Sequence, residues 1–234
     1  MTVPQRIQGL DWDRLGRDLD DRGWSQTPPI LSAEECEALA GLYDHERFRK
    51  KVDMGRHGYG EGEYKYFDHP LPDLVTDLRT SLYAPLADVA NRWAERLGEA
   101  TTYPPDHAGY LERCHEQGQG KPTPLILRYD EGGFNCLHQD LYGAVAFPLQ
   151  VVFLLSRPGQ DFKGGEFLLV EQRPRAQSRG EAITLEQGEA IIFATHHRPV
   201  ARIKGWARNN VRHGVSTIRS GRRFTLGVIF HDAE

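Results

Sequence analysis

Polar and apolar positions in the first 100 residues follow the spacing of helices. Trp12, Leu15 and Leu19 recur at intervals of three and four residues and end near Gly23, which predicts an amphipathic helix within residues 1–24. The stretch Ser32-Ala-Glu-Glu35 has the form of a capping box, which satisfies the first backbone N–H groups of a helix. Residues 71–97 carry another apolar helical face, and we expect Pro85 to split that helix.

The pattern changes after Pro124, where short β-like runs alternate with turn-rich stretches as in a sandwich or barrel. Residues 54–69, rich in Gly, His and Tyr, are predicted to be a mobile surface loop that covers a substrate, and residues 99–124 to be irregular. We predict one mainly β domain (1–234), with a helical N-terminal layer (1–100) and a jelly-roll, or double-stranded β-helix, core (101–234). The predicted strands span 125–129, 149–155, 166–171, 182–185, 190–193, 211–217 and 223–230.

Composition narrows the class of protein. The chain is 39% hydrophobic and 26% charged, as in ordinary globular proteins. It has no apolar run of about 18 residues that would span a membrane, and its first residues lack the apolar stretch of a secretory signal. Three widely spaced cysteines do not form a disulfide framework, and we expect a cytoplasmic protein.

Charge is distributed unevenly along the chain. Residues 157–234 contain 13 Lys and Arg against 8 Asp and Glu, whereas the whole chain has a net charge of −4. A basic half of this kind can face a polyanion. Charge counting alone favours the simpler interpretation of a dipolar, solvated surface.

The candidate chemistry centres on His138-Gln139-Asp140, which follows the turn at Gly132-Gly133. Residues two apart on a strand point to the same face, so His138 and Asp140 can bind one ion together. His213, on a later predicted strand, is the expected third ligand. Two imidazoles and one carboxylate leave coordination positions open, as in non-haem Fe(II) oxygenases.

Other interpretations of these histidines remain open. His138 and Asp140 alone would more simply be a hydrogen-bonded pair at a strand end. His196 and His197 compete with His213 for the role of third ligand, although they lack its strand setting. His57 and His69 are interpreted as loop histidines, because no partner stands two residues away on a confident strand.

Residues 125–230 resemble the Fe(II)/2-oxoglutarate-dependent dioxygenase superfamily. The spacing Tyr129-x-x-Gly132-x-x-x-x-x-His138-x-Asp140 is similar to the first half of the superfamily's sequence signature, as found in prolyl hydroxylases and AlkB-type demethylases. A turn between two central strands of the prolyl-hydroxylase group looks like Gly164-Gly165-Glu166. The distal half is similar to His213-x-Val215 followed by Gly221-x-Arg223-x-x-Leu226. The four pieces occur in the expected order.

The resemblance implies an enzyme that hydroxylates its substrate while converting 2-oxoglutarate and O2 to succinate and CO2. It implies Fe(II) on His138, Asp140 and His213. A planar guanidinium is needed to grip the far carboxylate of 2-oxoglutarate. The spacing selects Arg223 for this role, since the adjacent Arg222 faces the other side of the strand, and Tyr129 is the second co-substrate candidate.

The segment Arg128-Tyr129-x-x-Gly132-x-x-x-x-Leu137-His138-Gln139-Asp140 is similar to the corresponding AlkB stretch. The strand Arg222-Arg223-Phe224-Thr225-Leu226-Gly227 and the tail His231-Asp232-Ala233 resemble bacterial oxygenases thought to act on damaged nucleic acid. These resemblances imply oxidative demethylation of alkylated bases. Tyr142, Phe134 and Trp206 are candidates for stacking an extruded base, and Arg222 is a further substrate candidate. Phosphates would be neutralised by Arg173, Arg175, Arg179, Arg198, Arg202, Lys204, Arg208 and Arg212.

One position departs from the AlkB pattern. The second arginine of AlkB-type enzymes, six residues after the co-substrate arginine, is replaced here by Ile229. This departure counts against an AlkB role. Gly164-Gly165-Glu166 and the ten-residue spacing from His213 to Arg223 favour an alternative, a prolyl-hydroxylase-like enzyme acting on a protein side chain or small molecule. A third hypothesis is a jelly-roll sensor that binds metal without turnover.

Overall fold

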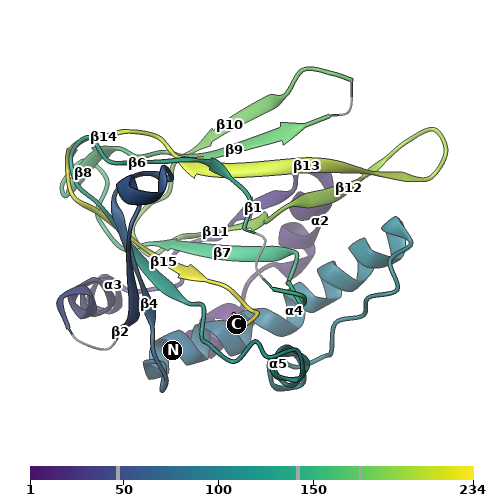
Figure 1. The fold of residues 1–234 in the computed structure, drawn as a ribbon, viewed down its shortest axis with the longest axis horizontal. Helices are drawn as coiled ribbons and strands as arrows, with labels where there is room; N and C mark the ends of the chain where they lie inside the picture. Colours follow the sequence, from purple (N-terminus) through teal and green to yellow (C-terminus); the bar gives the residue numbers. More distant parts are fainter. Residues whose placement is uncertain (46–47, 141–142, 174) are drawn as a thin grey trace.

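Two antiparallel sheets form the body of the protein in the computed structural model, which describes residues 1–45, 48–140, 143–173 and 175–234. They lie one above the other (Figure 1). The large sheet has the order β1 (Trp24–Gln26), β11 (Ala190–Ala194), β7 (Leu149–Leu154), β15 (Arg223–Val228), β5 (Leu125–Tyr129), β4 (Glu63–Phe67) and β2 (Phe48–Asp53).

The smaller sheet carries two long hairpins that project beyond the large sheet (Figure 1). Its order is β10 (Arg179–Ile183), β9 (Phe167–Gln172), β13 (Trp206–Val215), β6 (Phe134–His138) and β3 (Gly60–Glu61), with β12 (His197–Ala201) paired to β13. A separate pair is formed by β14 (Ile218–Gly221) and β8 (Phe162–Gly164). The facing sheets have the arrangement of a jelly roll.

Helices lie along the side of the large sheet that faces away from the small one (Figure 1). Since β7 is therefore covered on both faces, all six of its residues are buried. The helices are α1 (Val3–Gln8), α2 (Trp12–Arg22), α3 (Ala33–Gly41), α4 (Asp73–Leu97) and α5 (His107–Glu116), with 3-10 turns at Leu42–Asp44 and Gly55–His57. The first 100 residues also supply β1 to β4, so this part of the chain is not purely helical. The boundary at residue 100 stays a prediction.

Local signals set several boundaries as expected. The capping box at the start of α3 is confirmed, because the Ser32 hydroxyl accepts from the Glu35 N–H and the Glu35 carboxylate accepts from the Ser32 N–H. Gly23 ends α2 in the left-handed conformation, with φ of 79°, which glycine adopts without a steric cost.

Four expectations were wrong. Residues 1–24 form two helices rather than one, and α4 continues through Pro85 without a split, because its buried face packs along its whole length. Residues 54–69 are not a loop: β4 pairs with both β2 and β5. The stretch 99–124 contains α5. In each case long-range packing outweighs the local composition.

A buried arginine anchors the chain after β15. The guanidinium of Arg79, on α4, donates to the backbone carbonyls of Ile229, Phe230 and His231 and pairs with the Asp232 carboxylate at 2.7 Å. Arg79 and Asp232 are almost completely buried. These bonds satisfy carbonyls that would otherwise be buried without partners, and they hold the end of the strand that lines the cavity described next.

Candidate active site

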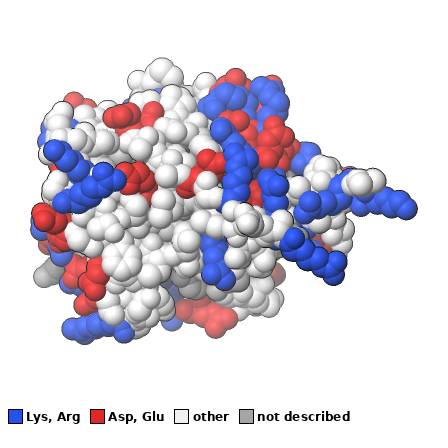
Figure 2. Space-filling model, turned by 90° about the horizontal axis from the view of Figure 1, so that it is seen from above, with Lys and Arg blue, Asp and Glu red and all other residues white. Residues whose placement is uncertain are grey.

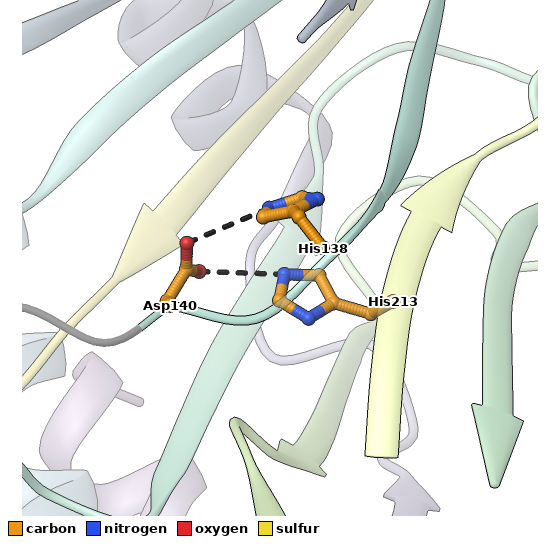
Figure 3. A group of neighbouring side chains, drawn as sticks. All are labelled: His138, Asp140 and His213. Carbon is orange, nitrogen blue, oxygen red and sulfur yellow. Dashed lines mark ion pairs between the residues drawn. The ribbon is translucent and has the colours of Figure 1, made fainter. Parts of the chain in front are cut away.

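The three predicted metal ligands lie together. His138 ends β6, and its partner across the strand pair is His213 on β13. The Nε2 atom of His138 is 3.5 Å from one Asp140 carboxylate oxygen, and Nε2 of His213 is 3.3 Å from the other. Candidate ligand atoms of all three side chains lie within 4.8 Å of one another. Figure 3 shows both imidazoles turned toward the carboxylate, so these residues could hold one metal ion.

Hydrogen bonds and ring contacts orient these side chains. Nδ1 of His138 donates to the Cys136 carbonyl at 2.8 Å, which leaves the Nε2 lone pair for a metal. The His213 ring stacks on Phe167, with centroids 5.9 Å apart, and lies 4.6 Å from the Phe193 ring.

Gln139 lies between His138, the last residue of β6, and Asp140, which follows the strand. Its side chain fixes the backbone of this segment. Its side-chain amide donates to the carbonyls of His196 and Val211, both at 2.9 Å. The turn that carries Asp140 is therefore attached to β13 and to the residue before β12.

The charges of this group suit a cation. Burial opposes ionisation of Asp140, but the hydrogen bonds and charges of the two imidazoles outweigh it and hold the pKa of that carboxyl well below its usual range. Burial lowers the pKa of His213, which favours the neutral imidazole that binds metals. For His138, burial acts in the same direction, but the Asp140 carboxylate prevails and raises the pKa.

A cavity of about 430 Å³ lies between the sheets beside this group. Arg223 on β15 and its cross-strand partner Tyr129 on β5 line it. Within the described part of the chain, Nε and Nη1 of Arg223 and the hydroxyl of Tyr129 are buried without a hydrogen-bond partner. Burial lowers the pKa of Arg223 to about 10, so the guanidinium remains charged at neutral pH. An anionic ligand would satisfy these groups, and the residues therefore fit 2-oxoglutarate.

Three of the substrate candidates, Phe134, Arg222 and Trp206, do not line this cavity. The Arg222 side chain is exposed and pairs with Asp130. Trp206 is 43% exposed, and its ring lies 4.5 Å from the Arg96 guanidinium. Tyr142 lies outside the described residues.

The competing histidines lie apart from the metal group. His197 is placed 3.5 Å from the Glu99 carboxylate and its ring contacts that of His196. Among the described residues, it is His213, and not His196 or His197, that lies together with His138 and Asp140.

Several cavity residues were not predicted from the sequence. Tyr64 and Tyr66 on β4 and Gln150 on β7 line the cavity. The alternation of the two tyrosines was a usable strand signal, and a glutamine within an apolar strand was another. Ile229 also lines the cavity, so the departure from the AlkB pattern lies within the site itself.

The fold and this group of residues define an Fe(II)/2-oxoglutarate-dependent oxygenase. A model of the Oxygenase-NA family, described as an oxygenase catalysing oxidative methylation of damaged DNA, matches residues 62–233, and the chain belongs to this family. The predicted superfamily is thereby confirmed. The predictions that the protein is an enzyme rather than a metal-binding sensor, and that it uses Fe(II), 2-oxoglutarate and O2, are confirmed as well.

The chain is also similar to two sequence relatives and to solved structures of the same type of fold. Two proteins of Mycobacterium tuberculosis, uncharacterized protein MT2286 and uncharacterized protein Rv2227, are each 50% identical over 167 residues, which cover 71% of this chain and 72% of the relative. A prolyl-4-hydroxylase from Pseudomonas putida has a TM-score of 0.55 at 17% identity, covering 95% of this chain and 99% of the other.

A prolyl hydroxylase from Trichoplax adhaerens, solved with a peptide of hypoxia inducible factor, has a TM-score of 0.58 at 14% identity over 98% of this chain and 92% of the other. These two structures support the mainly β, jelly-roll type of fold. In the described part of the chain, no helix combines the length and hydropathy needed to cross a bilayer.

Proposed function

We propose that this oxygenase removes alkyl groups from nucleic-acid bases by oxidative demethylation. His138, Asp140 and His213 hold Fe(II), and Arg223 and Tyr129 bind the far carboxylate of 2-oxoglutarate. The proximity of the three ligand side chains and the unsatisfied buried donors of Arg223 support these roles. The description of the family, which names damaged DNA, supports the class of substrate.

The cofactors, when bound, supply the hydroxylation chemistry, in which 2-oxoglutarate and O2 yield succinate and CO2, and a hydroxylated N-methyl group leaves as formaldehyde. The protein side chains orient and shield the reactants. Two imidazoles and one carboxylate occupy part of the coordination sphere and leave room for the co-substrate. Tyr64, Tyr66 and Leu127 line the cavity, and such a wall suits a flat, apolar-faced base and limits entry of water.

The observation that carries the proposal is the pair of hairpins β9–β10 and β12–β13. Both project past the end of β6 where His138 lies (Figure 1). Residues 173–180 contain three arginines, residues 198–208 contain four basic residues, and neither segment has an acidic residue. Figure 2 shows Lys and Arg side chains on the projecting end of this face. Cations placed in this way can contact phosphates flanking a base in the cavity.

Several of the predicted basic contacts already have partners within the protein. Arg179 pairs with Glu181 at 2.7 Å, and Arg202 donates to the Asn209 side chain at 2.9 Å. Arg198 is buried and pairs with Glu171 at 2.9 Å, so its role is structural. Arg208 is paired with Glu99 at 2.8 Å. Besides Arg208, the exposed cations of the hairpins are Arg173, Arg175, Arg179, Arg202, Lys204 and Arg212.

Succinate and formaldehyde release from methylated oligonucleotides tests the proposal. With methylated single-stranded or duplex DNA we expect formaldehyde to equal the succinate formed above the uncoupled background, and we expect neither product with Asp140→Ala. Reversing charge at Arg175 and Arg179 should weaken oligonucleotide binding and leave uncoupled 2-oxoglutarate turnover intact. Absence of salt-dependent binding and of stimulated turnover with every nucleic acid would refute the substrate class.

A second candidate function is hydroxylation of a protein side chain or small molecule. The apolar Ile229 in the cavity, at the place of an AlkB arginine, favours it. A succinate screen across peptides and metabolites separates the two candidates, because stimulation by a peptide or metabolite without formaldehyde release would favour simple hydroxylation.

A further inference from the structure

The tip of the β12–β13 hairpin exposes an isoleucine completely. Ile203 has a relative exposure of 104% and stands between Arg202 and Lys204, both exposed. The last strand pair before the tip joins Ala201 to Trp206. An aliphatic side chain so placed removes no surface from water in the free protein and therefore contributes nothing to its folding through burial. A binding partner could supply that burial.

A polar network joins the β12–β13 hairpin to β9. Glu171 on β9 accepts hydrogen bonds from Arg198 on β12 and from the Asn209 amide on β13. The side-chain Oδ1 of Asn209 in turn accepts from the Arg202 guanidinium at 2.9 Å. Arg198, Glu171 and Asn209 are buried. A projecting element fixed in this way loses little freedom on binding.

The tip is far from the metal ligands. Trp206 and His213 are seven residues apart on the same strand, which corresponds to about 23 Å at roughly 3.3 Å per residue. A DNA duplex rises about 3.4 Å per base pair. A duplex lying along the hairpin would therefore meet the tip about seven base pairs from the base in the cavity.

We propose that Arg202, Ile203 and Lys204 form a distal anchor for duplex nucleic acid, a proposal that rests on the proposed function. The two cations contact backbone phosphates, and Ile203 packs in the groove against sugars and base edges. Charge complementarity selects this partner, because residues 198–208 contain no acidic residue and the neighbouring β9–β10 hairpin adds Arg173 and Arg175. The same tip would not reach a short oligonucleotide centred on the cavity.

Duplex length is the variable that tests the anchor. Methylated duplexes with flanks of about 4 or about 12 base pairs on each side of the target bracket the seven-base-pair distance estimated from strand geometry. We expect the wild-type protein to bind the long duplex about tenfold more tightly than the short one, as measured by fluorescence anisotropy. Ile203→Ser should lose about threefold or more on the long duplex and nothing on the short one.

The two cations of the tip, Arg202 and Lys204, should affect the salt dependence of binding. Arg202→Ala with Lys204→Ala should reduce the slope of log affinity against log salt by about 1.8 on the long duplex, since each phosphate contact contributes roughly 0.9. Lys50→Ala is the matched control, because Lys50 is an exposed cation on β2, at the far edge of the large sheet. It should leave the slope unchanged.

The outcomes separate the anchor from the proposed function. Turnover of methylated duplexes with affinity independent of flank length would overturn the anchor and leave the proposed function standing. Equal losses for the tip variants on short and long duplexes would also overturn it. If no nucleic acid binds or stimulates turnover, both proposals fail. Loss of binding to anionic phospholipid vesicles in the tip variants, with nucleic-acid binding unchanged, would replace the anchor with a membrane contact.

Discussion

Replacing Arg223 with methionine should have opposite effects on the free and the ligand-bound protein. Arg223 is 2% exposed, and two of its nitrogens have no partner among the described residues. A buried donor left unsatisfied costs about 1–3 kcal/mol. Arg223→Met removes that cost while filling much of the same space, so we expect the free protein to become more stable by about 1–2 kcal/mol.

The ligand-bound form should show the reverse. A carboxylate gripped by two charge-assisted hydrogen bonds gains about 1.5–3 kcal/mol from each. Their loss predicts 2-oxoglutarate binding weaker by about 10²- to 10⁴-fold. At a ligand concentration 100 times its Kd, the wild-type protein gains about 2.7 kcal/mol of stability, and the variant should gain almost none.

Scanning calorimetry under anaerobic conditions, with Fe(II) and with or without 2-oxoglutarate, measures both effects. For a chain of this size the stabilisation of the free variant corresponds to a rise in Tm of about 2–8 °C. Arg222→Met is the control, because the neighbouring side chain is exposed and pairs with Asp130; it should preserve the ligand-induced rise. An undiminished ligand response in Arg223→Met, or its loss in Arg222→Met, would refute the role assigned to Arg223.

Three further predictions concern the metal group and the core. Asp140→Ala should abolish the visible charge-transfer band expected with anaerobic Fe(II) and 2-oxoglutarate; persistence of the band would exclude this carboxylate as a ligand. Gly214→Ala should cost about 1–3 kcal/mol in urea unfolding, because a Cβ there would lie 2.6 Å from the Asn135 carbonyl oxygen, and an unchanged midpoint would contradict this. Burial, aided by Arg79, lowers the pKa of His107 to about 4, so between pH 6.5 and 4 the unfolded chain binds more protons and stability falls as pH falls. The loss at pH 5 is roughly 2 kcal/mol, and His107→Gln should show a smaller difference between unfolding at pH 7 and at pH 5 than the wild-type protein.

Short-range spacing was sufficient to predict much of the candidate site. Strand alternation predicted that His138 and Asp140 would share one ion site and that Arg222 and Arg223 would face opposite sides. Asp140 lies just beyond β6 and Arg222 just before β15, but the expected grouping of His138 with Asp140 and the contrast between buried Arg223 and exposed Arg222 are both present. The capping box of α3 likewise depends on residues within one turn. Each of these predictions concerns the direction of a side chain relative to its own element, which the local sequence determines.

Burial and pairing partners, in contrast, depend on segments far apart in the chain. The sequence predicted that Arg198 would be a surface cation, but in the structure it is paired with Glu171 on β9. Trp206 looked like an aromatic of the active site, but the length of β13 carries it away from His213. Residues 54–69 as a whole have a loop-like composition, but residues 63–67 within them form a strand because β2 and β5 supply partners on both sides. The sequence by itself determined which side chains share a face, whereas the tertiary structure decided which faces are covered, since covering depends on contacts between distant segments.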